Sequence, residues 1–204
     1  MIKAILFDMG GVLVDLDKPR CVKNFKERAG LMEIAEILDC YHQKGFFHDF
    51  EGGRLTLDEF YAEALKLCRP GATAEDVKEC SCSLLVSVPK YKADLLNELK
   101  ENYDLYILSN NNPITTGFAA GLFEAAGAPY SVFKEILISS EMKLQKPSEE
   151  IFREAIRRTG YAPEELLFID DSRINADAAS ALGIRGVYYN PATENLRDTV
   201  FANL

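Results

Sequence analysis

Residues 4–11 read AILFDMGG: an apolar run of strand length that ends at Asp8, followed at once by Gly10 and Gly11. A short apolar run bounded by polar or small residues is typical of a buried strand, and the two glycines allow a tight turn after it. In parallel sheets, ligands bind beyond the carboxyl ends of the strands. Asp8 is therefore the first candidate for a functional group.

Apolar runs of the same kind recur along the chain, with segments of helical spacing between the later ones. Residues 92–99 place Leu95, Leu96 and Leu99 on one helix face, and residues 149–159 form an amphipathic segment that ends before Gly160. Strands that alternate with helices imply crossover units, so we predict an α/β fold with a Rossmann-like, three-layer, doubly wound parallel sheet. The further predicted strands are residues 104–108, 135–138, 166–169 and 186–189.

The stretch from Gly11 to about Asn102 is far too long for a simple crossover, so it must contain a subdomain. Its apolar residues have helical spacing in pieces, and glycine and proline supply breaks at residues 51–53 and 69–71. We predict a small helical bundle that forms a cap over residues 15–87, with residues 1–14 and 88–204 forming the core. The expected helices of this bundle cover residues 22–29, 32–41, 57–67 and 74–85.

Composition and charge exclude several classes of function. With 23 basic and 32 acidic side chains the net charge is −9, which repels nucleic acid and anionic membranes. The apolar run before Asp8 is too short for a signal peptide, and no stretch approaches the length of a membrane span. We therefore expect a cytoplasmic protein without a membrane or nucleic-acid partner. The number of cysteines is odd, and their spacing matches neither a zinc site nor a redox pair, so we interpret all of them as reduced thiols. They are Cys21, Cys40, Cys68, Cys80 and Cys82.

Polar side chains stand at the ends of other predicted strands as well. Ser109 and Asn110 follow the second strand, and Asp170 and Asp171 end the fourth; Asn175 lies four residues after Asp171, and Lys146 precedes Pro147 and a helix. Each of them alone could be a helix cap, a turn residue or a surface charge. Together they combine carboxylates that can hold a hard cation with hydroxyl, amide and ammonium groups that can surround a phosphoryl group. Phosphoryl transfer is the chemistry that needs both.

These residues form motifs that resemble those of the haloacid dehalogenase superfamily, in its branch with a helical cap inserted after the first motif. The resemblance covers essentially the whole chain, and the motifs occur in the expected order and spacing. Residues 108–113 are further similar to a subgroup of sugar-phosphate phosphatases. The four motifs are residues 5–15, residues 107–110, Lys146-Pro147, and residues 168–172 with Asn175.

The resemblance implies a Mg²⁺-dependent phosphatase in which Asp8 attacks phosphorus and forms an aspartyl-phosphate. Mg²⁺ would be held by the carboxylates of Asp8 and Asp171 and by the main-chain carbonyl of Gly10. The expected substrate is a small phosphorylated metabolite, with sugar phosphates as one possibility. The sequence carries no signal for the oligomeric state.

The resemblance also implies roles for the remaining motif residues. Ser109 and the backbone N–H of Asn110 would bind phosphoryl oxygens, and Lys146 would neutralise the nucleophile and the developing charge on the phosphate. Asp170 and Asn175 would orient the waters of the metal.

The sequence departs from the family pattern at Gly10, where most phosphatases of this superfamily have an aspartate that protonates the leaving group. Such acid–base assistance is worth about 10²–10⁴-fold. The role of the missing aspartate could pass to Asp15, Asp17 or Asp170, or to metal-bound water. A substrate with a good leaving group would not need an acid. Two alternatives are a phosphate-binding or regulatory protein without turnover, and a 2-haloacid dehalogenase, which normally has an aromatic residue at this position.

The cap contains polar residues that are candidates for contact with the substrate. It also contains an aromatic cluster. For each of the polar residues a solvated surface role is the favoured interpretation. The cluster of Phe46, Phe47 and Phe50 could line a cap pocket or pack the bundle. The polar candidates are Arg20, His42, Lys44, His48 and Arg54.

Overall fold

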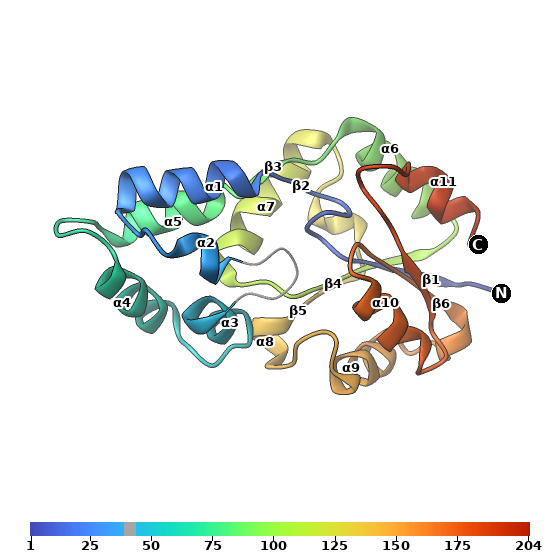
Figure 1. Cartoon of the computed structure of the whole chain (residues 1–204). Coiled ribbons are helices and arrows are strands. Elements are labelled where there is room, and N and C mark those ends of the chain that lie inside the picture. The colour runs from blue at the N-terminus through green and yellow to red at the C-terminus, as the bar shows by residue number, and fades with distance from the viewer. Residues whose placement is uncertain (39–43) are drawn as a thin grey trace.

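Five parallel strands form one sheet in the order β5-β4-β1-β6-β7. The structure is a computed structural model that describes residues 1–38 and 44–204 (Figure 1). The chain runs outward from the central β1 through β4 to β5, and then returns to the other side of β1 as β6 and β7, which is a doubly wound arrangement. The strands are β1 (Ala4–Phe7), β4 (Asp104–Ser109), β5 (Glu135–Ile138), β6 (Leu166–Asp170) and β7 (Arg185–Tyr188). The predicted fold class is confirmed.

The alternation of side chains along the strands explains the two helical layers. In β1, Ile5 and Phe7 pack into one apolar cluster with α6 (Lys90–Leu99), α7 (Pro113–Ala126) and α11 (Leu196–Phe201). Ala4 and Leu6 point to the opposite face, toward α9 (Glu149–Thr159) and α10 (Arg173–Ser180). Every residue of β1 is therefore buried, as a sheet covered on both faces requires.

Between β1 and β4 the chain forms a helical insertion with its own apolar cluster, in which Phe60 contacts Phe46, Phe47 and Phe50. It lies at the end of the molecule away from both termini (Figure 1). Its helices are α1 (Lys18–Asn24), the π-helix η1 (Phe25–Ala29), α2 (Ile34–Ile37), α3 (Gly45–Glu51), α4 (Leu57–Leu67) and α5 (Ala74–Cys82). The remaining elements are the antiparallel pair β2 (Asp15–Leu16) and β3 (Leu85–Ser87), α8 (Ser139–Met142), and the 3₁₀ turns η2 (Tyr130–Val132) and η3 (Pro163–Glu165).

Local chemistry sets several of these boundaries. Capping boxes start α4 at Thr56 and α5 at Thr73, and Gly160 ends α9 with a φ of 73°. The predicted helix over residues 74–85 is wrong at its end, because α5 stops at Cys82 and Leu85 pairs with Leu16 in the β2–β3 ribbon.

The described residues also show whether any helix could span a membrane and which thiols are free. Within residues 1–38 and 44–204, no helix is both long and apolar enough to cross a membrane. Four of the cysteines are free thiols: Cys21, Cys68, Cys80 and Cys82. Cys40 lies outside the described residues.

Candidate active site

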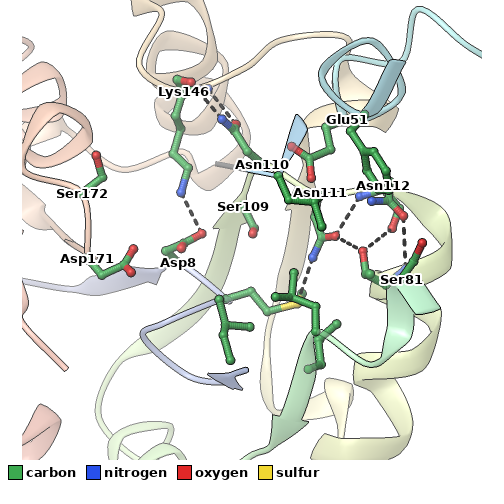
Figure 2. A pocket seen from close by; sticks show the side chains of 18 of the residues that line it. Asp8, Glu51, Ser81, Ser109, Asn110, Asn111, Asn112, Lys146, Asp171 and Ser172 are labelled. Carbon is green, nitrogen blue, oxygen red and sulfur yellow. Dashed lines mark hydrogen bonds and ion pairs between the residues drawn. The ribbon is translucent and has the colours of Figure 1, made fainter. Parts of the chain in front are cut away.

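The carboxyl ends of β1, β4 and β6 meet at one cavity of about 130 Å³ between the sheet and the helical insertion. All residues that the motifs single out line this cavity, and Figure 2 shows several of them converging from separate elements. Adjacent parallel strands that end together bring their following residues together, which is why distant motifs meet here. These residues are Asp8, Gly10, Ser109, Asn110, Lys146, Asp170, Asp171 and Asn175.

Lys146 is the central cation of the site. Its buried ammonium donates to Asp8 Oδ1 at 2.8 Å, to Asp170 Oδ2 at 2.6 Å and to the carbonyl of Leu108 at 2.9 Å. Burial favours the neutral amine, but the carboxylates of Asp170 and Asp8 outweigh it and raise the pKa of Lys146. The three donor hydrogens are thus all used, and the amine stays charged.

Asn110 holds the loop that carries Lys146. Its side-chain amide donates to the carbonyl of Lys146 at 2.8 Å, and its side-chain oxygen accepts from the backbone N–H of Lys146, also at 2.8 Å. This reciprocal pair ties the end of β4 to the residue before Pro147. The side chain of Asn110 is therefore structural, and only its backbone remains for contact with a ligand.

Asp170 is fully buried and fully engaged. Besides Lys146, it accepts from the backbone N–H of Ser172 at 2.7 Å and from the amide of Asn175 at 3.0 and 3.1 Å. Asn175 Oδ1 is itself buried and accepts no hydrogen bond from any residue that the structure describes. An unpaired buried acceptor beside a carboxylate indicates room for a water or an ion's hydration shell.

The carboxylates of Asp8, Asp170 and Asp171 bring one oxygen each to within 4.8 Å of one another, against the single charge of Lys146. Burial raises the pKa of Asp8; the ammonium of Lys146 opposes this shift and Asp170 adds to it. Burial, Asp8 and Asp170 together raise the pKa of Asp171 to about 7. An oxygen-lined cluster with excess negative charge fits a hard divalent cation, which would relieve this repulsion.

Gly11 makes room for Asp171. Its φ is +77°, and a Cβ at this position would lie 2.2 Å from Asp171 Oδ2. Only glycine combines this backbone conformation with so close an approach. Gly11 therefore makes room for the carboxylate cluster and also allows the tight turn after β1.

Gly11→Ala is expected to remove Mg²⁺-induced stabilisation, because the new methyl group displaces the Asp171 carboxylate. Thermal unfolding with and without Mg²⁺ measures this shift. Gly127→Ala is the matched control, because Gly127 has a φ of +83° but no atom within 4 Å of the added Cβ. Both variants should lose about 1 kcal/mol from backbone strain, and only Gly11→Ala should lose the Mg²⁺ shift. An equal Mg²⁺ shift in both variants would contradict the assignment.

The side chain of Leu16 in β2 crowds position 10. A Cβ at Gly10 would lie 3.2 Å from Leu16 Cδ1, so a longer side chain there would have to displace the tip of this leucine. Of the substitutes considered from sequence, Asp15 pairs with Lys92 at 2.8 Å and Asp17 caps α1 through the N–H of Arg20. Neither of them is among the residues that line the cavity.

The insertion's own side of the cavity is mostly apolar, and Phe47 both packs the bundle and lines it. One acidic residue, Glu51 at the end of α3, stands among these groups. Burial and the charge of Asp8 raise the pKa of Glu51 to about 8, while Lys146 opposes the shift. The apolar lining comprises Leu16, Phe25, Leu38, Phe47, Leu84 and Leu85.

The polar cap residues named as candidates for contact with a substrate make other contacts or lie elsewhere, as the favoured surface interpretation implies. Arg20 donates to the carbonyls of Ser83 and Leu85, and Arg54 binds Asp49 and the side chain of Gln145. Together with Lys44 and His48, they are absent from the cavity lining among the described residues. His42 lies outside the described residues.

Glu51 itself was overlooked in the sequence, where it was interpreted only as part of a break before two glycines. A signal was available: Phe47, Phe50 and Glu51 are spaced three and four residues apart and share one helix face. An acidic residue on the apolar face of a helix needs a reason to be there.

Comparisons with known proteins agree with this geometry. A family model described as haloacid dehalogenase-like hydrolase matches residues 2–183. A D-ribitol-5-phosphate phosphatase of Bacteroides thetaiotaomicron is 35% identical over 185 residues, which cover 90% of this chain and 89% of the relative.

Two solved structures are also similar over nearly the whole chain. A B. thetaiotaomicron enzyme of the same family, in complex with magnesium and inorganic phosphate, has a TM-score of 0.88 and 36% identity, covering 96% of this chain and 97% of that one. A family hydrolase from Porphyromonas gingivalis has a TM-score of 0.89 and 34% identity, covering 99% and 97%.

Proposed function

The chain belongs to the haloacid dehalogenase-like hydrolases, and from this membership we propose that it is a Mg²⁺-dependent phosphatase of small phosphomonoesters, sugar phosphates among them. The observation that carries the proposal is the meeting of three carboxylates, a charged lysine and a serine hydroxyl at one cavity. The relatives add support, since one hydrolyses a sugar-alcohol phosphate and another holds magnesium and phosphate.

In this proposal Asp8 is the nucleophile. Lys146 binds one of its oxygens and so restrains the carboxylate, to which the backbone of Met9 also contributes a hydrogen bond. A carboxylate oxygen attacks phosphorus, and the ester is replaced by an aspartyl-phosphate that water later hydrolyses. One difficult displacement thus becomes two easier ones.

Asp8, Asp171 and the carbonyl of Gly10 would hold the Mg²⁺. The cation supplies charge neutralisation for the phosphate oxygens and allows several carboxylates to stay ionised side by side. The unpaired acceptor of Asn175, whose amide donates to Asp170, would orient its waters. The raised pKa of Asp171 supports a cation here, because burial and the negative charges of Asp8 and Asp170 raise it and a cation would offset those charges.

Ser109 and the backbone N–H of Asn110 would bind the phosphoryl oxygens opposite the metal. Ser109 is 3% exposed and its hydroxyl makes no hydrogen bond with any described residue, so its donor is free for a ligand. Lys146 lies between Asp8 and Asp170 and would neutralise the charge that develops during transfer.

The test is Mg²⁺-dependent phosphate release from a panel of phosphomonoesters that includes D-ribitol 5-phosphate. Chelation is expected to reduce release to the level of Asp8→Asn, and added Mg²⁺ should restore it. If no ester on the panel is hydrolysed above that level, the phosphate-binding alternative replaces the proposal. Halide release from 2-haloacids would instead indicate a dehalogenase.

A further inference from the structure

We propose that Glu51 is the proton donor and acceptor of the reaction, in the place of the acid that position 10 lacks. This inference rests on the proposed phosphatase function. It assigns a catalytic residue to the helical insertion, whereas all the other proposed catalytic groups belong to the core.

The core side of the cavity offers no carboxyl that is free for this task. Asp8 is the nucleophile, Asp171 belongs to the metal cluster, and Asp170 is held by Lys146, Ser172 and Asn175. The space beside Gly10 is occupied by Leu16. Any acid for the leaving group must therefore come from the other side.

Glu51 lines the cavity from that other side. In an in-line displacement the leaving oxygen departs on the side of phosphorus opposite to the nucleophile. Asp8 lies at the sheet end of the cavity, so the leaving group faces the helical insertion. Figure 2 shows the carboxyl of Glu51 reaching from the end of α3 toward Asn110 and Asn111, on the side of the site away from Asp171.

The position of Glu51 is fixed through its backbone. The hydroxyl of Ser139 donates to the carbonyl of Glu51 at 2.5 Å and accepts from the backbone N–H of Asn111 at 3.0 Å. The next loop adds a second tie, because Arg54 donates to Gln145 at 3.2 Å, one residue before Lys146. The main chain at Glu51 is thus anchored, through the hydroxyl of Ser139, to the loop that follows β4.

The carboxyl of Glu51, by contrast, has no partner within the part of the chain that the structure describes. Asp49, on the same helix, pairs with Arg54 at 2.8 Å. Placing an acid against apolar walls without a partner costs free energy, and such costs are concentrated at functional sites. A bound ester would supply the missing partner through its bridging oxygen.

The surroundings of Glu51 favour the protonated form that a donor needs. Its environment raises the pKa to about 8 through burial and the negative charge of Asp8, against the opposing charge of Lys146. Among the described residues, only Asp8 and Lys146 exert such a charge effect on it, and the ionisable groups of α3 itself and of the neighbouring α4 and α8 do not.

The reaction has two displacement steps, and Glu51 gives up a proton in the first and regains one in the second. In the first, the Asp8 oxygen bonds to phosphorus, the bond from phosphorus to the leaving oxygen breaks, and the Glu51 proton passes to that oxygen to release the alcohol. In the second, the Glu51 carboxylate takes a proton from water while the water oxygen bonds to phosphorus and the bond to Asp8 breaks. Inorganic phosphate leaves, and both residues return to their starting states.

The test compares wild type with Glu51→Gln on phenyl phosphates that differ only in a ring substituent, so that binding is held constant while the leaving group changes. Phenol release in a single turnover is measured with Mg²⁺ present. For nitrophenyl phosphate, a good leaving group that needs no proton, the variant should stay within about threefold of wild type. For methylphenyl phosphate it should lose about 10²-fold in rate.

Two readouts separate a proton donor from a residue that only shapes the pocket. In wild type, single-turnover release from methylphenyl phosphate should fall as pH rises past about 8, and Glu51→Gln should lose this dependence. Asp49→Asn, which removes a carboxylate from the same helix but outside the cavity, should retain both the rates and the pH profile of wild type.

The outcomes also distinguish this inference from the proposed function. If wild type hydrolyses the esters and Glu51→Gln matches it on every leaving group, the inference is overturned and the phosphatase stands. An equal loss on all leaving groups, or a rise in KM alone, likewise overturns it, because it indicates packing or binding. If wild type itself releases no phenol, the proposed function fails first.

Discussion

Asp8→Asn is expected to lower the rate of phosphate release by on the order of 10⁴-fold or more, because an amide cannot form the phosphoenzyme. The fold should not suffer. Burial and Asp170 disfavour the charge on Asp8, so a neutral side chain relieves repulsion within the cluster, and its oxygen can still accept from Lys146. Without Mg²⁺, the variant should therefore unfold at the same temperature as wild type or higher.

Steady-state phosphate release and thermal unfolding in chelator together check this prediction. Asp17→Asn is the matched control, since asparagine caps a helix as well as aspartate does and Asp17 lies outside the cavity. It should retain wild-type activity. Substantial turnover by Asp8→Asn would contradict a phosphoenzyme on this residue, whereas a loss in Asp17→Asn would return Asp17 to the set of candidate acids.

Lys146→Met is expected to destabilise the protein by about 3–5 kcal/mol in the absence of Mg²⁺. The substitution keeps the volume of the side chain but leaves Asp8 and Asp170 buried without their cation. The deficit should shrink as pH falls, because the raised pKa of Asp8 lets its carboxyl take up a proton in the folded state and a protonated carboxyl needs no counter-charge. Phosphate release should be lost as well, since the charge on the transferred group is no longer neutralised.

Urea unfolding in chelator at several pH values measures this effect. Lys92→Met is the matched control, because Lys92 is as buried as Lys146 but pairs with Asp15, whose side chain is 49% exposed and can be solvated by water. It should cost clearly less than Lys146→Met. Equal costs for the two variants would mean that the charge of Lys146 does not hold the carboxylates together.

The core of this fold could be predicted because its signals are local. The strands β1 and β5 and the helices α4 and α9 have the predicted boundaries, since apolar runs, capping residues and Gly160 mark them within a few neighbours. Asp8, Ser109, Asp170 and Asp171 end strands or follow them directly, so predicting the sheet was enough to bring these four to one edge. Lys146, on the loop before α9, needed the resemblance to the family as well. The short β2–β3 ribbon was missed, because two or three residues are too few to show an alternating pattern.

The insertion's side of the site depends on distant contacts instead. Arg20 and Arg54 looked like ligand contacts because they are cationic, yet their donors are used by backbone carbonyls and by Asp49 and Gln145. Glu51 faces the cavity because α3 packs against α8 in the core, a contact that no pattern within the insertion encodes. Only the assembled fold relates the end of α3 to Asp8.

The hydroxyl of Ser139 has a consequence for engineering. Because it joins the last residue of α3 to the loop after β4, it sets the registration of the insertion on the core. A helical insertion grafted from a relative to change specificity would arrive without that alignment unless a hydroxyl remained at position 139. Chimeras of this protein should therefore treat Ser139 as part of the transplanted unit, although it lies far from the insertion in the sequence.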